Sequence, residues 1–363
     1  MVLMHPAGVP EEVQVPAAGG ESVRKFHKGN LPRLPRGVIL EDALSRIVLA
    51  CVEHLRANEE CVATRAHIEG AHQMRVAIRR LRCCLALFGD LLPANQCQYL
   101  DGELRWLLKE LAPARDWDVF LDETLPPVLR QFEGEARLDE LRLQAQAKQD
   151  EGYSRAATAL QAQRYTGLVM LLAAWADGRS WHDPFGPPAH PSLASKATDA
   201  VSQLLDQLLS AVLNCGADFA DLNAEQRHLL RIEIKKLRYA TEFFASLFPR
   251  RRLNPFLVTL KTLQDRLGVE NDAAVARRLL LRLTKECNGR ERTRLAYAAG
   301  LVVGWHAHTA DSRQQHLDAL WAKLTAYPPF WRRAEVSPAA DSTAVDSTVA
   351  DSTAADSTAA AVA

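Results

Sequence analysis

The chain carries the same pattern of residues twice, at a fixed distance along its length. HQMRVAIRRLRCCLALFGDLLP at 72–93 and HLLRIEIKKLRYATEFFASLFP at 228–249 align without a gap, and the offset from His72 to His228 is 156 residues. The same offset aligns LRWLLKELAPARDWDV at 104–119 with LKTLQDRLGVENDAAV at 260–275. A second match in the register fixed by the first indicates two copies of one structural unit.

The central part of the chain has the sequence character of helices. It is rich in Ala, Leu, Arg, Glu and Gln with apolar residues three and four apart, and alternating runs of Val, Ile and Thr are nearly absent. We therefore predict an all-α fold. The main interruption, DGRSWHDPFGPPAHPS at 177–192, holds two Gly and four Pro and is expected to link the two halves.

The two ends of the chain have a different composition. Residues 1–36 are rich in Pro, Gly and charge and are expected to form a disordered leader. From residue 334 the chain carries four DST units at a five-residue period and no aromatic residue, which predicts a disordered tail over 334–363. The structured domain is thus predicted over 37–333, with halves at 37–180 and 190–333.

A row of basic residues runs along the first aligned stretch and recurs in the second. On a helix of about 100° per residue, its four members in each copy fall within roughly 80° of one another, beside a separate apolar face. The rows are His72, Arg75, Arg79 and Arg82, and His228, Arg231, Lys235 and Arg238. The chain as a whole has 44 basic and 44 acidic residues, so any preference for an anion has to come from such local charge.

The simplest alternative is that each row is only the solvated side of an amphipathic helix. Solvated helix faces usually mix both signs, because like charges four residues apart oppose the helix, as Arg75 and Arg79 do here. The rows therefore favour a binding surface. Guanidinium and ammonium groups suit phosphate oxygens, and a histidine adds a further donor when it is protonated.

The sequence gives no sign of catalytic or metal chemistry. It has neither a GxxxxGK[ST] loop nor a Rossmann glycine pattern, and EGEAR at 133–137 lies in a helical stretch where alternate residues face different ways. The histidine pairs His67/His72 and His306/His308 do not have the i, i+4 spacing of metal ligands. We expect no catalytic residue, no metal and no cofactor, and we expect Asp116 and Asp272 to orient the cations near them.

Cysteine usage and hydropathy bear on the compartment. The seven cysteines include no CxxC pair, which fits a reducing compartment better than a disulfide framework. No signal peptide and no window of 18 uncharged apolar residues is present, so we expect a soluble, cytoplasmic protein without a membrane partner.

The two aligned stretches resemble the halves of a CHAD domain, the conserved histidine α-helical domain. The resemblance rests on HQMRVAIRRLR with LAPARDWDV and on HLLRIEIKKLRY with LQDRLGVENDAAV, and it extends over about residues 38–333. It implies two antiparallel helical bundles related by a pseudo-twofold axis, with the basic rows facing a shared groove or pore. It also implies that inorganic polyphosphate is the ligand.

The resemblance places the binding residues on the two basic rows and beyond them. The expected polyphosphate-binding residues are His72, Arg75, Arg79, Arg82, Arg105, Lys109, His228, Arg231, Lys235, Arg238 and Lys261, with Arg80, Arg115, Lys236 and Tyr239 at the rim. The second half has Asp265 in place of Lys109 and Asn271 in place of Arg115, so the two sides of the groove are expected to differ in charge.

Three functions remain open at this point. The first is a non-enzymatic polyphosphate-binding protein that is targeted to polyphosphate granules or organises the polymer. The second is a helical nucleic-acid-binding protein that uses the same cations, although only Tyr239, at the edge of the second row, could stack on a base. The third is a scaffold whose basic rows meet an acidic protein.

Overall fold

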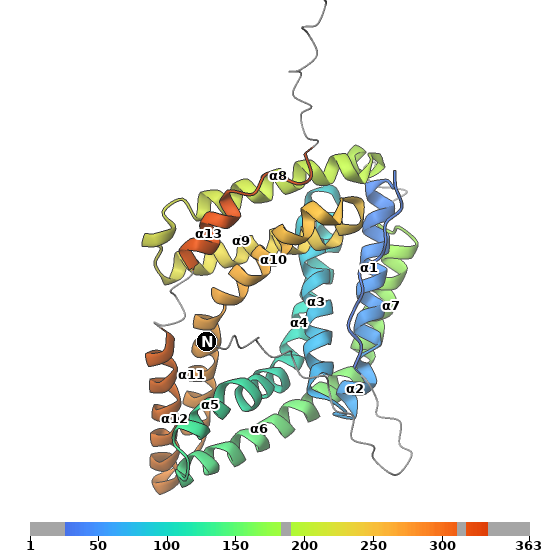
Figure 1. Cartoon of the computed structure of the whole chain (residues 1–363). Helices are drawn as coiled ribbons and strands as arrows, with labels where there is room; N and C mark the ends of the chain where they lie inside the picture. Colours follow the sequence, from blue (N-terminus) through green and yellow to red (C-terminus); the bar gives the residue numbers. More distant parts are fainter. Residues whose placement is uncertain (1–25, 183–189, 311–316, 333–363) are drawn as a thin grey trace, which may run out of the picture. The chain divides into compact units, whose positions relative to one another are not determined.

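A computed structural model describes residues 26–182, 190–310 and 317–332, and these residues fold into helices (Figure 1). Within those ranges there is no strand beyond an isolated bridge between Ile39 and Lys196, so the predicted all-α fold is confirmed. None of the helices in these ranges is long and apolar enough to cross a bilayer. Most of the expected leader, the middle of the expected linker and the expected DST tail lie outside the described residues.

The helices of the first half are α1 (Leu40–Arg56), α2 (Glu59–Ala63), α3 (Ile68–Phe88), α4 (Ala94–Val119), α5 (Leu125–Gln131), α6 (Ala136–Gln161) and α7 (Gln163–Asp177). Those of the second half are α8 (Ala197–Cys215), α9 (Ala224–Phe243), α10 (Arg250–Arg266), α11 (Val269–Glu286), α12 (Gly289–Ala310) and α13 (Leu317–Thr325). A single π-helical turn, Phe120–Thr124, joins α4 to α5.

The sequence offset reappears in the helix boundaries. Helix α9 begins 156 residues after α3, and a short 3₁₀ turn follows each of them. Pro93 and Pro249 then occupy the N-cap positions of α4 and α10, where a missing backbone N–H costs no hydrogen bond. The copies diverge further along, because α4 continues unbroken to Val119 whereas α10 ends at Arg266 and α11 begins at Val269.

The apolar faces of α3 and α9 explain why these two helices lie together. Met74, Ile78 and Leu81 of α3 are buried, and so are the residues at the matching positions of α9, Leu230, Ile234 and Leu237. The two helices contact each other, and the equivalent rings of Phe88 and Phe244 meet edge to face with centroids 5.9 Å apart. Burial of each such side chain stabilises the fold by about 1.5–3 kcal/mol. The packing of these apolar faces places α3 beside α9, and with them the two basic rows.

The hydrophobic cores do not divide at the predicted linker. One core includes buried residues from α1, α3, α4 and α7 together with residues from α8, α9 and α10. A second core joins the end of α4, the π turn, α5 and α6 to α11 and α12. Each core therefore mixes helices from both halves. The pseudo-twofold axis and the groove between two bundles stay predictions.

Residues 26–36, the last part of the expected leader, pack against the helices. His27 and Asn58 exchange two hydrogen bonds of 2.9 Å, and Arg80 of α3 donates to the Gly29 carbonyl at 3.2 Å. A Cβ at Gly29 would lie 2.2 Å from the His54 ring, so only glycine fits at this position without displacing the ring. Hydrogen bonds and close packing hold this stretch, which differs from the disordered leader that its composition predicts.

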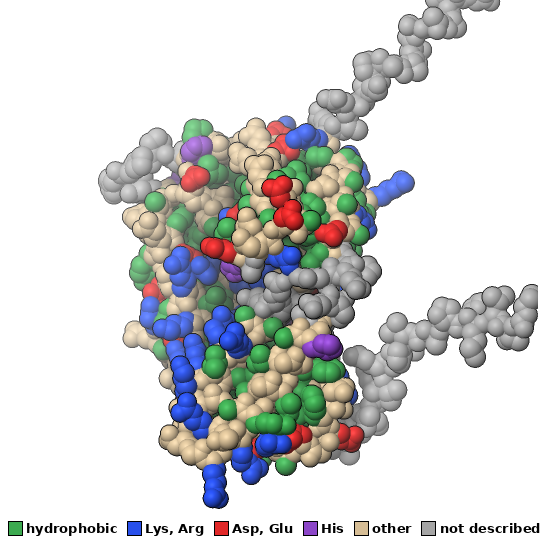
Figure 2. All heavy atoms as spheres, turned by 90° about the vertical axis from the view of Figure 1, so that its left-hand side faces the viewer, with side chains coloured by type: hydrophobic (Ala, Val, Ile, Leu, Met, Phe, Trp, Pro, Cys, Tyr) green, Lys and Arg blue, Asp and Glu red, His purple; other side chains and the backbone are tan. Residues whose placement is uncertain are grey.

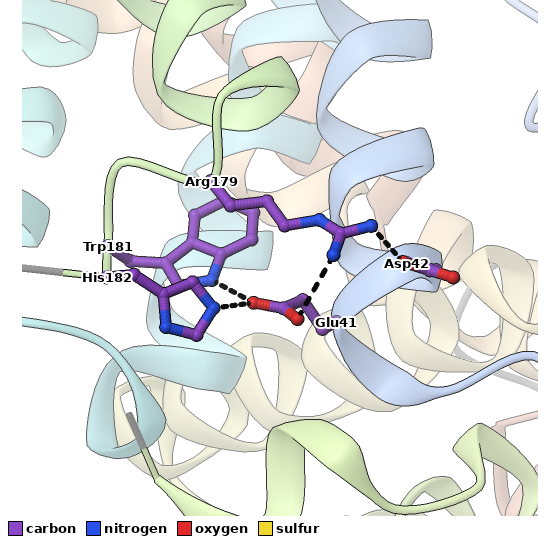
Figure 3. A network of polar contacts seen from close by, with 5 residues as sticks. All are labelled: Glu41, Asp42, Arg179, Trp181 and His182. Atoms are coloured by element: carbon purple, nitrogen blue, oxygen red, sulfur yellow. Dashed lines mark hydrogen bonds and ion pairs between the residues drawn. The ribbon is translucent and has the colours of Figure 1, made fainter. Parts of the chain in front are cut away.

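The chain after α7 is tied to the start of α1 by a polar network (Figure 3). The Glu41 carboxylate accepts hydrogen bonds from the Trp181 indole at 2.7 Å, from His182, and from Arg179, which also pairs with Asp42. Glu41 is buried, and these partners offset the cost of removing its charge from water. The first residues of the expected linker are therefore fixed to the fold.

Candidate functional site

A pocket of about 230 Å³ lies where α3, α4, α9, α11 and the π turn meet. Its basic lining residues are His72, Arg75, Arg79, Arg115 and Arg231, and its acidic ones are Asp116 and Glu123. Apolar side chains of the π turn and α11 complete the lining, among them Phe120 and Leu279. The structure thus brings together cations from both predicted rows in one small volume.

Arg75 lies at the centre of the charged lining. Its side chain is only 19% exposed, and its Nη2 is 3.7 Å from Oδ1 of Asp116. Burial lowers the pKa of Arg75, while Asp116 acts in the opposite direction. Within the described part of the chain, Nη1 of Arg75 and Nε of Arg231 are buried without a hydrogen-bond partner. Such donors are costly to leave unpaired, and an anionic oxygen in the pocket would satisfy them.

The surrounding cations change the titration of His72, which lines the pocket, and of Lys235, which is near Arg79 and Arg231 but does not line it. Burial, followed by the charge of Arg115, lowers the pKa of His72 to about 4, so this ring is neutral at pH 7. Burial, together with Arg79 and Arg231, lowers the pKa of Lys235 to about 8. Perturbed groups of this kind are typical of functional sites. An anion bound in the pocket would favour the protonated form of both groups, and so would act against the neighbouring cations, which lower their pKa values.

Helix α11 supplies two arginines that the sequence reasoning did not include, Arg278 and Arg282. Neither lines the first pocket, but Arg282 lines a neighbouring one. Burial raises the pKa of the Asp116 carboxyl, and the charges of Arg75, Arg278 and Arg282 oppose this rise. Both arginines of α11 lie outside the aligned stretches. The available signal was their i, i+4 spacing in one helix, the same like-charge spacing that marks the basic rows. Figure 2 views the side of the molecule on which α11 and α12 lie. It shows Lys and Arg side chains gathered over the lower half of that side, where these two helices are.

Several predicted site residues are paired with acids or amides instead of lining the pocket. Arg82 and Arg105 both bind Asp101, each with an N–O distance of 2.6 Å. Arg238 pairs with Glu242 and donates to Gln264 at 2.8 Å, and Lys236 pairs with Glu233 at 2.7 Å. These acids neutralise much of the charge at the far end of both rows.

The remaining predicted residues lie around or away from the pocket. His228 and Lys261 are exposed and do not line it. Tyr239 is buried, with the Arg238 guanidinium 4.4 Å from its ring centroid. Lys109 lines a neighbouring pocket. Arg115 does line the first pocket and is 3.3 Å from Glu123, while the side chain of Asp272 lies outside the described residues.

Comparison with known proteins places this arrangement among solved folds. The model of the CHAD domain family matches residues 46–281. The crystal structure of the CHAD domain from the plant Ricinus communis is similar with a TM-score of 0.71 and 31% identity, and covers 84% of this chain and 98% of that chain. PptA from Streptomyces chartreusis shares the fold with a TM-score of 0.59 at 17% identity, over 78% of this chain and 100% of that one.

Sequence relatives extend the comparison to longer proteins. The uncharacterized proteins MT2285 and Rv2226, from two strains of Mycobacterium tuberculosis, are each 27% identical over 304 residues. The match covers 82% of this chain and 55% of theirs, so the chain spans about half the length of the curated relatives it matches.

Proposed function

The chain belongs to the CHAD domain family, as its two aligned stretches predicted, and on this premise we propose that it binds inorganic polyphosphate without catalysing a reaction. The observation that carries the proposal is the pocket in which Arg75, Arg79, Arg115 and Arg231 converge, with two buried guanidinium nitrogens unpaired. In the cell, such binding would target the protein to polyphosphate granules or organise the polymer there.

A polymer of phosphates suits this site better than a single phosphate. A chain can contact cations from α3, α4 and α9 together, and each contact neutralises one more negative charge. Binding of this kind releases counterions, so the affinity falls steeply as salt is added, with a slope of about −0.7 to −0.9 per neutralised phosphate by analogy with nucleic acids. We expect affinity to rise with chain length.

Nucleic acid is the competing ligand, because the same cations would neutralise its backbone. Single-stranded nucleic acid is usually held by exposed aromatic rings that stack on bases. The aromatic residue that lines the described pocket is Phe120, and it is buried at 1% exposure. This observation favours a ligand without bases.

A charge-reversal titration tests the proposal. The wild-type protein and a variant with Arg75→Glu, Arg79→Glu, Arg231→Glu and Lys235→Glu are titrated with long-chain polyphosphate at two salt concentrations. The matched control reverses four exposed arginines away from the pocket, Arg251→Glu, Arg252→Glu, Arg290→Glu and Arg292→Glu. Circular dichroism checks that both variants stay helical.

The outcomes separate the ligands and the surfaces. The proposal expects tight, salt-sensitive binding that is lost in the pocket variant and largely kept in the control. Equal binding by all three proteins would mean that the basic rows are solvated helix faces. Displacement of polyphosphate by duplex DNA or RNA at the same phosphate concentration would favour nucleic acid instead.

A further inference from the structure

A second pocket adjoins the first on the other side of Asp116. It has a volume of about 530 Å³ and lies between α4, α6 and α11. Asp116 and Leu279 line both pockets, so together they form the wall between them. A ligand that filled the first pocket and continued past this wall would enter the second.

Most of the charges in the second pocket are already paired. Nζ of Lys148 lies 2.9 Å from Oε2 of Glu151 and 2.8 Å from Oε2 of Glu286, so it forms ion pairs with both acids. Arg155 is engaged by Glu110, with Nη2 3.0 Å from Oε1. These pairs satisfy one another and leave little attraction for an added anion.

Lys109 and Arg282 are the exceptions. Both line the second pocket and both are exposed. Neither has an ion pair or a side-chain hydrogen bond with another residue in the ranges that the structure describes. They come from different helices, α4 and α11. Two cations that line one pocket without a partner among the described residues are suited to contact an anionic ligand in it.

Asp116 lines both pockets and has cations near it from each. Arg75 pairs with it and lines the first pocket, and Arg282, whose charge also acts on it, lines the second. An anion that extended past the carboxylate would therefore meet a cation before it and another after it, which limits the repulsion to a short part of its length.

We propose that long polyphosphate chains continue from the first pocket past Asp116 into the second, where Lys109 and Arg282 bind phosphates that short chains do not reach. This proposal rests on the proposed function and adds the residues that distinguish long chains from short ones. A long chain has many more phosphate groups than the five basic lining residues of the first pocket can contact, so the rest of the chain has to continue outside it.

The test compares tripolyphosphate with long-chain polyphosphate on four full-length proteins. These are the wild type, Arg282→Ala, Lys109→Ala and the control Arg292→Ala, which removes an exposed arginine of α12 that lines neither pocket. For each pocket variant we expect a three- to tenfold loss of affinity for the long chain, and a salt slope reduced by about 1. Affinity for tripolyphosphate should stay at the wild-type value, and the control should match the wild type with both ligands.

Two results would overturn the inference. An equal loss for both ligands would mean that Lys109 and Arg282 act on the first pocket through their field alone. No loss for the long chain would mean that the polymer leaves the first pocket by another route. An Arg75→Ala variant tests the proposed function separately, because wild-type affinity for both ligands in that variant would remove the first pocket itself as the site.

Discussion

The two copies of the repeat differ most where the helix after the basic row passes the site. In the first copy, α4 runs unbroken for 26 residues and carries Arg115 and Asp116 into the pocket. In the second copy, the equivalent stretch is divided at Gly268, and α11 packs against the π turn and α12. Helix α11 then lines the pocket beside Arg75. Two similar sequences have therefore produced one shared site instead of two equal ones.

The equivalent side chains of the two rows show the same difference. His72 is half-buried in the pocket, whereas His228 is exposed. Arg75 has Asp116 as its counter-ion, whereas Nε of Arg231 is buried without a partner among the described residues. The chemical type at each position is set by the repeat, but its electrostatic surroundings are set by the helix that packs beside it.

The largest expected effect concerns the close approach of α4 and α6 at Gly152, a position at which the second copy has no glycine. A Cβ at Gly152 would lie 2.6 Å from the backbone nitrogen of Ala114, and the same sequence offset leads to His308 in α12. We expect Gly152→Leu to lower the free energy of unfolding by about 2–3 kcal/mol, because α6 has to move away from α4. Urea denaturation followed by circular dichroism measures the change.

The control for this close approach is Gly300→Ala in α12. No atom lies within 4 Å of a Cβ added there, so we expect no loss and a gain of up to about 1 kcal/mol from helix propensity. Equal destabilisation by the two substitutions would show that the close approach at Gly152 is not what fixes α4.

The next effect concerns Arg75 and Arg231, which occupy equivalent positions in the two copies. Arg75→Ala removes a ligand contact and also the ion pair with Asp116, whereas Arg231 forms no ion pair with the acids that the structure describes. We expect the affinity for polyphosphate to fall by about 2 kcal/mol in the first variant and by about 1 kcal/mol in the second. Isothermal titration calorimetry compares them.

A double variant sharpens this comparison. Adding Asp116→Asn to Arg75→Ala should recover roughly half of the lost affinity, because the repelling carboxylate is gone. If the double variant binds no better than Arg75→Ala alone, the counter-ion is not the source of the difference between the two copies.

A pH titration tests the environment of His72. Burial, then the charge of Arg115, lowers the pKa of His72 to about 4 from the 6.5 of an ordinary histidine. The unfolded chain therefore binds a proton at His72 that the folded chain does not, so stability is full above pH 6.5 and is lost as the pH falls toward 4. Solvent at the half-buried ring screens the effect, and we expect about 1 kcal/mol.

The measurement is the free energy of unfolding at pH 7 and pH 4.5 for the wild type and His72→Gln. His72→Gln should flatten the dependence on pH. The same slope in both proteins would assign the dependence to other groups.

The smallest expected effect is a change of affinity with pH at Lys235, which stands in the second copy where the first has Arg79. Burial, with Arg79 and Arg231 nearby, lowers the pKa of Lys235 to about 8, so this residue loses its charge as the pH rises from 7 to 9. We expect affinity for polyphosphate to fall about threefold over that range. Lys235→Arg should bind equally at both pH values, since arginine stays protonated. A threefold fall in that variant as well would contradict the assignment.

The sequence predicted the parts of the site that depend on one helix. Periodicity predicted an apolar face beside the first basic row, and Met74, Ile78 and Leu81, three apolar residues of that helix, are buried. It also placed Arg75 and Arg79 on one side of the helix, and both line the pocket. These features follow from the residues of a single helix, so no knowledge of the fold was needed.

Sequence reasoning missed pairs within one helix and contacts between helices. Arg238 pairs with Glu242 four residues away in α9, a spacing that the sequence displays, whereas no spacing rule shows that Arg82 of α3 reaches Asp101 of α4. The position of α11 beside the π turn depends likewise on packing between helices. Pairing within and between helices thus decides which cations of a basic row are available to a ligand.

The mixed cores also bear on what either half could do by itself. A single copy of the repeat would leave the partner side of each core exposed to water, as a large apolar surface that has to be covered. Each half thus serves the other as the subunits of an obligate dimer do, although one chain carries both. Because the halves are joined, they need not be identical, and the second can carry Asp265 where the first has Lys109.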